Sequence, residues 1–229
     1  MSFPWQSELP RFLGYYNLVF LLDAVLTTIG LSAIGCLAGA GAGFALALAR
    51  LTTAPYLLPL RFGALAFVEM FRRIPFLVTL MLVFFAFQLT GADIPLFVVA
   101  ATSVFLIAAA FLGEIIRGGF AAVHRNQWDA AVAMNFGLLG TIRHIVLPQA
   151  WKIILPPAFG FFVMFIKDTA LASQIGVVEL TFAGKVLINK GFSASLVLLV
   201  TLLLYFAVSY PLTCLGTYLE RRLVVSRHH

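Results

Sequence analysis

The sequence predicts an all-α integral membrane protein with five transmembrane helices. Composition is the first reason, because 62% of the 229 residues are hydrophobic and only 10% are charged. A soluble domain carries about a quarter charged residues. The second reason is the distribution of the apolar residues, which form five stretches long enough to cross a bilayer at about 20 residues per helix. We expect a single transmembrane domain over residues 1–229.

The first two predicted spans are joined by a short turn. The five spans cover residues 19–49, 60–89, 94–116, 153–175 and 194–219. The first is longer than a bilayer requires, so we expect it to tilt or protrude. Its glycines at Gly35, Gly39 and Gly43 recur at every fourth position, which predicts close packing against another helix. Pro55 and Pro59 mark the turn before the second span.

The remaining spans are separated by a polar loop and by a shorter segment. The third span ends near Glu114 and Arg117, an i,i+3 pair that we interpret as a surface salt bridge. The polar loop then covers about residues 117–152 and leads to the fourth span. A loop or short helix over residues 177–193 precedes the fifth span.

Positive charge predicts the orientation of the spans. Five spans place the two termini on opposite sides of the membrane. The side with the polar loop collects Arg50, Arg61, Arg117, Arg125, Arg143, Lys152, Arg221, Arg222 and Arg227. The other side keeps Arg11, Lys185 and Lys190. Because cytoplasmic loops are rich in Lys and Arg, we expect the polar loop and the C-terminus inside and the N-terminus outside.

No catalytic or metal-binding pattern is found in the sequence. It contains no G-x-x-x-x-G-K-[ST], G-x-S-x-G or H-E-x-x-H. A phosphate-binding P-loop, the nucleophile elbow of an α/β-hydrolase and a zinc protease are therefore not indicated. Cys36 and Cys214 stand alone, without metal-ligand spacing. The net charge is +6, but the sequence contains no run of basic residues. The charge therefore does not indicate nucleic-acid binding. We expect no cofactor and no catalytic residue, so active transport would draw energy from a partner or an ion gradient.

The polar loop is expected to contain a short helix. Asn126 is a favourable N-cap, and Asp129 lies three residues later, near the positive end of the helix dipole. Trp128, Val132 and Phe136 are predicted to form one apolar ridge that can be buried. An amphipathic helix lying on the lipid headgroups and a helix presented to another protein both fit this pattern.

Residues of this loop carry a resemblance to a known family. Gln127-Trp128-Asp129-Ala130-Ala131, continued by Ile145 to Ala150, resembles the EAA loop of ABC-importer permeases, in particular the polar amino-acid branch. The spacing matches without a gap, with Asp129 in place of Glu and Asn135 in place of Gly. Asn tolerates a left-handed backbone, and Gly137 follows two residues later, so the family's turn can be kept. The resemblance implies a cytoplasmic coupling helix that docks on a separate ATPase subunit through Gln127, Trp128, Asp129, Ala130, Ala131, Asn135 and Gly137.

Two further segments resemble motifs of the same family. Residues 69–77 are similar to E-x-F-R-G-T-P-L-L, and residues 167–181 are similar to K-D-T-S-L-A-S followed by I-G-V-x-E-L-T. The resemblance implies that the second segment lines the translocation path. We therefore take the following residues as candidates for the substrate pathway: Glu69, Arg72, Arg73, Lys167, Asp168, Thr169 and Ser173.

The charges in these two segments admit two interpretations. Glu69 can pair with only one of Arg72 and Arg73. We interpret Arg73, which replaces the family's Gly, as the surplus cation; it either favours a carboxylate-bearing substrate or snorkels to the interface. Lys167 and Asp168 are adjacent and point in different directions, so they either line the path or pair with neighbouring helices.

The resemblance implies a type I importer fold and a transport function. It implies a permease subunit for a polar amino acid or a derivative of one, in the bacterial cytoplasmic membrane. Two ATP-binding subunits that hold ATP and magnesium, a second permease chain (identical or a sibling), an external substrate-binding protein and membrane lipids are the implied partners. The alternatives are an ion-coupled secondary carrier or channel that uses the intramembrane charges, and a purely structural subunit. Five spans without an internal repeat do not favour a carrier.

Overall fold

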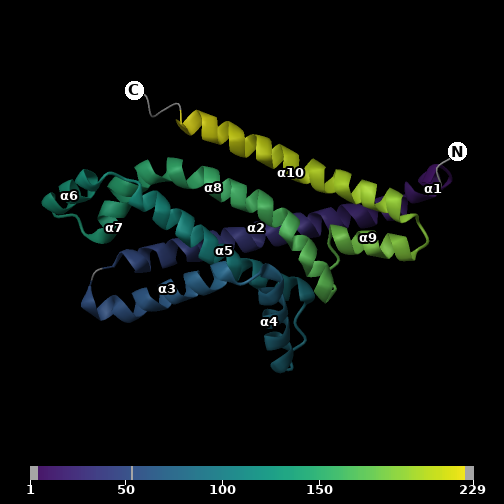
Figure 1. Ribbon diagram of the computed structural model, residues 1–229, viewed down its shortest axis with the longest axis horizontal. Coiled ribbons are helices and arrows are strands. Elements are labelled where there is room, and N and C mark those ends of the chain that lie inside the picture. The colour runs from purple at the N-terminus through teal and green to yellow at the C-terminus, as the bar shows by residue number, and fades with distance from the viewer. Residues whose placement is uncertain (1–4, 53, 225–229) are drawn as a thin grey trace. The chain divides into compact units, whose positions relative to one another are not determined.

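The computed structural model describes residues 5–52 and 54–224, and helices make up its regular structure (Figure 1). No strand occurs in these two ranges. Four helical stretches are long and apolar enough to cross a membrane: Tyr15–Leu51, Leu96–Ala121, Leu138–Ile175 and Ala194–Leu223. A fifth crossing is present if a broken pair of helices is counted as one span. The predicted all-α membrane fold is confirmed.

The second predicted span is broken into two helices. Residues 60–89 were expected as one helix, but α3 covers Leu58–Arg73, after the short turn η1 at Pro55–Leu57, and α4 covers Phe76–Leu89. Ile74 between them has an extended backbone, with φ −88° and ψ 131°. The ring of Pro75 disfavours the helical conformation for the residue before it. Pro75 also has no backbone N–H to donate to a helical hydrogen bond. The break therefore follows from Pro75.

The chain divides into two compact units, each built from segments far apart in sequence. One unit contains residues 1–35, 76–104 and 163–212, and the other contains residues 36–75, 105–162 and 213–229. The long helices α2 (Tyr15–Leu51), α5 (Leu96–Ala121), α8 (Leu147–Asp168) and α10 (Ala194–Val224) contribute to both. We call the first of these compact units the 163–212 unit and the second the 105–162 unit.

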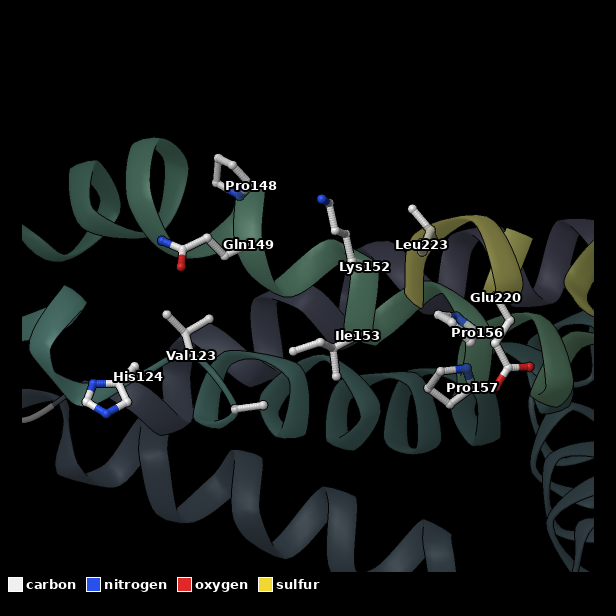
Figure 2. A pocket seen from close by; sticks show the side chains of 11 residues that line it. Val123, His124, Pro148, Gln149, Lys152, Ile153, Pro156, Pro157, Glu220 and Leu223 are labelled. Carbon is white, nitrogen blue, oxygen red and sulfur yellow. The ribbon is translucent and has the colours of Figure 1, made fainter. Parts of the chain in front are cut away.

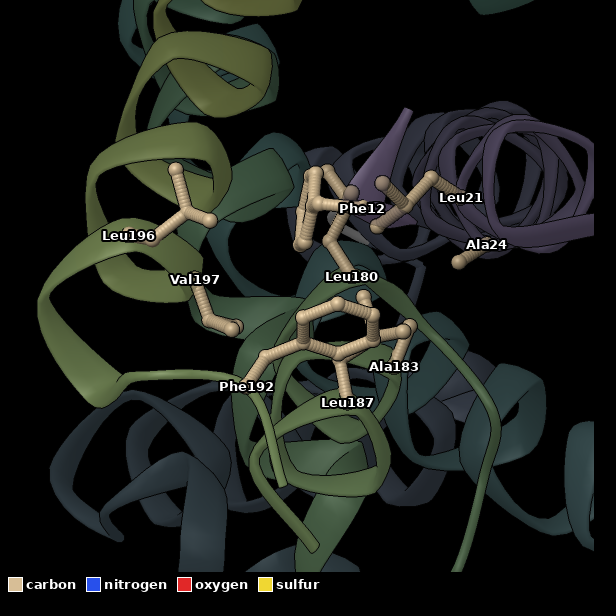
Figure 3. Packing of buried hydrophobic residues seen from close by; sticks show 9 residues of the cluster. All are labelled: Phe12, Leu21, Ala24, Leu180, Ala183, Leu187, Phe192, Leu196 and Val197. Carbon is tan, nitrogen blue, oxygen red and sulfur yellow. The ribbon is translucent and has the colours of Figure 1, made fainter. Parts of the chain in front are cut away.

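The core of the 163–212 unit joins the start of the chain to helix α9. Helix α1 (Trp5–Phe12) ends at Phe12, whose ring meets Phe192 edge-on with centroids 5.2 Å apart. Both rings are buried beside Leu180 and Leu187 of α9, which covers Leu180–Asn189 (Figure 3). Thr28 of α2 is fully buried, and its hydroxyl accepts a hydrogen bond from the Leu180 N–H at 3.2 Å. These contacts fix α9 against the first part of α2.

A buried carboxylate begins helix α9. Glu179 is fully buried and accepts hydrogen bonds from the N–H groups of Thr181 and Phe182, at 2.9 and 2.8 Å. The Tyr205 hydroxyl donates a third hydrogen bond at 2.8 Å. Burial raises the pKa of the Glu179 carboxyl, whereas the three hydrogen bonds lower it. The network thus offsets part of the cost of burying this group and ties α10 to the start of α9.

The 105–162 unit is held together by a close crossing of α2 and α5. A Cβ atom placed on Gly39 would lie 2.5 Å from the Ala108 Cβ, and one on Gly43 would lie 2.7 Å from the Gly113 N atom. The predicted close packing is confirmed at Gly39 and Gly43. The hydrophobic core of this unit contains Ala47, Ile116, Phe120, Val123, Ile142, Val146 and Ala150.

Candidate functional site

The polar loop of the 105–162 unit folds into short helices. Helix α6 covers Arg125–Ala133, α7 covers Leu138–Thr141, and the π-helical turn η2 (Ile142–Val146) runs into α8. The N-cap is His124, whose Nδ1 accepts a hydrogen bond from the Asn126 N–H at 3.3 Å. The expectation that Asn126 caps the helix was therefore wrong by two residues, because an imidazole nitrogen supplies the acceptor. Asp129 instead lies 3.9 Å from the Nε of Arg125.

The turn after α6 uses Asn135 in the left-handed conformation. Asn135 has φ +59° and is the non-glycine residue with positive φ in the described chain. Its N–H donates to the Val132 carbonyl, and the Phe136 N–H donates to the Ala131 carbonyl. The prediction that Asn135 can adopt a left-handed backbone at this turn is confirmed. Gly137 has φ −71° and is the N-cap of α7, so it does not share the left-handed role.

Replacing Asn135 tests this turn. We expect Asn135→Gly to retain the wild-type melting temperature, because glycine adopts a positive φ without strain. Asn135→Val should lower the free energy of unfolding by about 1–2 kcal/mol, since a β-branched residue is strained there. Thermal unfolding of the purified protein measures both. Equal melting temperatures for the two variants would contradict the role of backbone strain at this turn.

Exposed apolar side chains surround this turn. Val132 is 73% exposed and Leu139 is 70% exposed, and Met134, Phe136 and Leu138 are also exposed. We call these five residues the loop surface. Trp128 packs against the core below, and Ala131 is fully buried. The expected ridge of Trp128, Val132 and Phe136 is therefore wrong: only Trp128 faces the core, and Phe136 follows the end of the helix.

The remaining predicted coupling residues lie on the open side of α6. Gln127, Asp129 and Ala130 are exposed. The Gln127 side-chain oxygen accepts a hydrogen bond from the Gln149 amide at 3.3 Å, which links α6 to the first turns of α8. The loop helix is thus held at a fixed place while its polar face stays accessible.

Two hollows flank the loop helix. One of about 530 Å³ lies under α6, beside Trp128 and Asp129. The other, of about 520 Å³, lies between the end of α5, the first turns of α8 and the last turns of α10 (Figure 2). His124, Lys152 and Glu220 supply its charged or titratable side chains. In Figure 2 these three side chains come from separate elements and do not converge on one point, so the hollow does not form a focused polar site.

The predicted pair of Glu114 and Arg117 is part of a larger cluster. The Arg117 Nη2 atom lies 2.6 Å from a Glu114 carboxylate oxygen. Arg50, at the end of α2, contacts the other oxygen, and the Arg72 guanidinium lies 4.0 Å from that same oxygen. The side chains of Arg50, Glu114 and Arg117 are half-buried, and that of Arg72 is exposed. The interpretation as a surface salt bridge missed this cluster, although a carboxylate inside a predicted span was a signal for it.

Arg73 is the paired arginine of its motif, not the surplus one. Its Nη2 atom lies 2.7 Å from the Glu69 carboxylate, one helical turn away. Arg72 points to the Glu114 cluster instead, and its guanidinium lies 5.7 Å from the Phe111 ring centre. Residues at i+3 and i+4 both lie within reach of Glu69, so the contact of Arg72 with the Glu114 cluster decides that Glu69 pairs with Arg73. The surplus positive charge therefore belongs to Arg72.

The other pathway candidates lie in the 163–212 unit, where α8 ends. Lys167 is exposed and Asp168 is half-buried in the last turn of this helix. The buried Thr169 begins the 3₁₀ turn η3 (Thr169–Ile175), and its hydroxyl donates to the Ile166 carbonyl at 2.7 Å. Ser173 accepts a hydrogen bond from the Lys185 Nζ at 3.1 Å. Their role in substrate passage stays a prediction.

The comparisons with known proteins identify the family. The family model described as "Binding-protein-dependent transport system inner membrane component" matches residues 41–225. The chain belongs to this family. The permease is 30% identical to a probable glutamine ABC transporter permease protein, GlnP, of Bacillus subtilis, over 92% of this chain and 98% of that protein. It is 28% identical to the probable amino-acid ABC transporter permease protein YckA of the same organism, over 96% of each chain.

A solved structure shows the same fold as the permease. The crystal structure of an amino acid ABC transporter with histidines covers 97% of this chain and 100% of its own, with a TM-score of 0.83 and 24% identity. The predicted permease identity and importer-like fold are confirmed, and the family match favours them over an ion-coupled carrier. Within the described residues, no group of three His, Cys, Asp or Glu side chains is placed to hold a metal ion.

Proposed function

We propose that this permease carries a polar amino acid or an amino-acid derivative into the cell as part of an ATP-driven importer. The observation that supports this most is the family match over residues 41–225, which includes the loop helix α6 and its exposed face. Relatives that align over nearly the whole chain are named as amino-acid or glutamine permeases. The substrate class of this chain is inferred from those names and from the matching motifs.

The loop surface is the proposed docking site of the ATPase. Five exposed apolar side chains next to a polar helix face form the kind of patch that marks a protein–protein contact. Two ATP-binding subunits would bind ATP and magnesium and dock here, one on each of two permease chains. The second permease chain is a copy of this one or a sibling, and an external binding protein delivers the substrate.

The proposed orientation follows from docking. The loop helix and the C-terminus lie in the cytoplasm, where ATP is available, and the N-terminus lies outside. This arrangement agrees with the positive charges of the sequence, nine of which fall on the loop side and three on the other side. Closure of the ATPase pair would then move the loop helices and switch access to the pathway. Glu69, Arg72, Arg73, Lys167, Asp168, Thr169 and Ser173 are the proposed pathway residues.

Reversing one charge on the loop helix tests this function. Asp129 is two-thirds exposed, and its contact with Arg125 is long, so Asp129→Lys should hardly change folding. We expect ATP-dependent amino-acid uptake into proteoliposomes to fall about tenfold or more, because reversing a charge at a docking site disturbs its electrostatic complementarity with the partner. The matched control is Asp93→Lys, which reverses an exposed charge in the turn after α4.

Two results would contradict the proposal. Wild-type uptake in Asp129→Lys would remove the docking role of α6. Native mass spectrometry of the complex extracted from its membrane, with this chain as bait, tests the partners directly: a mass balance without an ATP-binding subunit would overturn the importer. The copy number in the same spectrum distinguishes two identical permease chains from a sibling pair.

A further inference from the structure

Three arginines gather around a single carboxylate inside the 105–162 unit. Arg117 reaches Glu114 through two nitrogens: Nη2 at 2.6 Å from Oε1, and Nε at 3.1 Å from both carboxylate oxygens. Arg50 donates to Oε2 from the end of α2. Both oxygens of Glu114 are therefore occupied by these two partners. Glu114 holds Arg50 and Arg117 in place and has little capacity left for a third cation.

Arg72 is the third cation, and its ion contact is weak. Its Nη1 atom lies 4.0 Å from Glu114 Oε2, beyond hydrogen-bonding distance. The nearest carboxylate on its own helix, Glu69, is engaged by Arg73. The guanidinium carbon lies 5.7 Å from the centre of the Phe111 ring, and a phenyl ring offers no oxygen acceptor to the N–H donors of Arg72. About a third of each of the Arg72 and Arg117 side chains is exposed.

The cluster carries two more positive charges than negative charges. Arg50 and Arg117 lie near the ends of α2 and α5, and Arg72 lies near the end of α3, which counts as a membrane span only together with α4. An arginine keeps its charge in a protein, so the surplus positive charge of the cluster persists unless an anion balances it. A guanidinium fork matches an oxyanion with two parallel hydrogen bonds, a fit that neither water nor a ring provides.

We propose that Arg72, with Arg117 and Arg50 beside it, forms an oxyanion-binding site in the membrane domain. The shared chemistry of its ligand is a singly charged oxyanion. One source is the phosphate of an anionic phospholipid, and the other is the carboxylate of a small molecule such as an amino acid. Glu114 is the positioning residue of the site, and Arg73 is excluded from it by its pair with Glu69. With a phospholipid as the ligand the inference goes beyond the proposed function; with an amino-acid carboxylate it rests on that function, because Arg72 is one of the proposed pathway residues.

The test is protection of Arg72 from an arginine reagent. The purified complex is placed in nanodiscs of a phosphate-free galactolipid, with or without phosphatidylglycerol, and treated with phenylglyoxal at constant ionic strength. Peptide mass spectrometry measures the rate of modification at each arginine. Arg61 and Arg73, both exposed on α3, are the internal references. Acetate added to the galactolipid nanodiscs is the carboxylate probe.

The expected result is modification of Arg72 that is roughly tenfold slower when an oxyanion is present, as a charge-assisted hydrogen-bonded contact implies. Protection by phosphatidylglycerol alone identifies a lipid phosphate, and protection by acetate in neutral nanodiscs identifies a carboxylate. Unchanged modification of Arg72 under both conditions, or equal slowing at Arg61 and Arg73, would overturn the site. Uptake is measured separately, so loss of ATP-driven transport with Arg72 still protected would count against the proposed function alone.

Discussion

Replacing Gly43 by alanine should destabilise the permease by about 1–3 kcal/mol, the usual range for overpacking a tight contact. The added Cβ would lie 2.7 Å from the Gly113 N atom and 2.9 Å from the Ala109 carbonyl oxygen. Both neighbours are backbone atoms of α5, so no side chain can rotate away. The two helices would have to separate, and the contacts around the crossing would weaken with them. Thermal unfolding of the purified protein in detergent measures the loss.

Gly41 provides the matched control on the same helix. A Cβ at this position meets no atom within 4 Å. Gly41→Ala should therefore be neutral, or raise stability by about 0.5–1 kcal/mol through better helix propensity. A Gly43→Ala variant that melts at the same temperature as Gly41→Ala would show that the close crossing of α2 and α5 is not needed for stability.

The apolar composition was sufficient to predict the membrane helices, and the spacing of the glycines was sufficient to predict the crossing at Gly39 and Gly43. Long apolar stretches have one way to satisfy their backbone in lipid, which is a helix, and a glycine at every fourth position lies on one side of that helix. The break at Pro75 was also encoded locally. It was missed because the span was assigned from hydropathy, which does not register the effect of proline on Ile74.

The site was predicted less well than the fold, because its details depend on contacts between segments. The left-handed backbone of Asn135 was predictable from one residue and its motif. Which of Arg72 and Arg73 would pair with Glu69 could not be decided from spacing, since both offsets permit an ion pair. The role of Glu114 required knowing that Arg50 and Arg72, 64 and 42 positions earlier, come to the same carboxylate. Contacts between residues so far apart in the sequence cannot be predicted from their spacing.

Removing the carboxylate of Glu179 should have the largest effect on the 163–212 unit. In Glu179→Ala, the N–H groups of Thr181 and Phe182 lose their acceptor, whereas the Tyr205 hydroxyl keeps the Thr181 hydroxyl as a partner at 3.0 Å. These groups lie where water has little access, because Glu179 is fully buried. A buried donor without a partner costs about 1–3 kcal/mol, so the two N–H groups together should cost roughly 2 kcal/mol or more. The melting temperature of the purified permease reports this loss.

Glu8 is the matched control, because it is also a carboxylate that accepts a backbone hydrogen bond in the same unit. It accepts from the Ser193 N–H at 2.8 Å but is only half-buried, so Glu8→Ala should cost about 1 kcal/mol. Tyr205→Phe removes a single donor and leaves the two N–H groups of α9 paired with Glu179, so it should fall near Glu8→Ala. If Glu179→Ala melted no lower than these two variants, the start of α9 would be held by apolar packing around Leu180 and Leu187, and the carboxylate would contribute little.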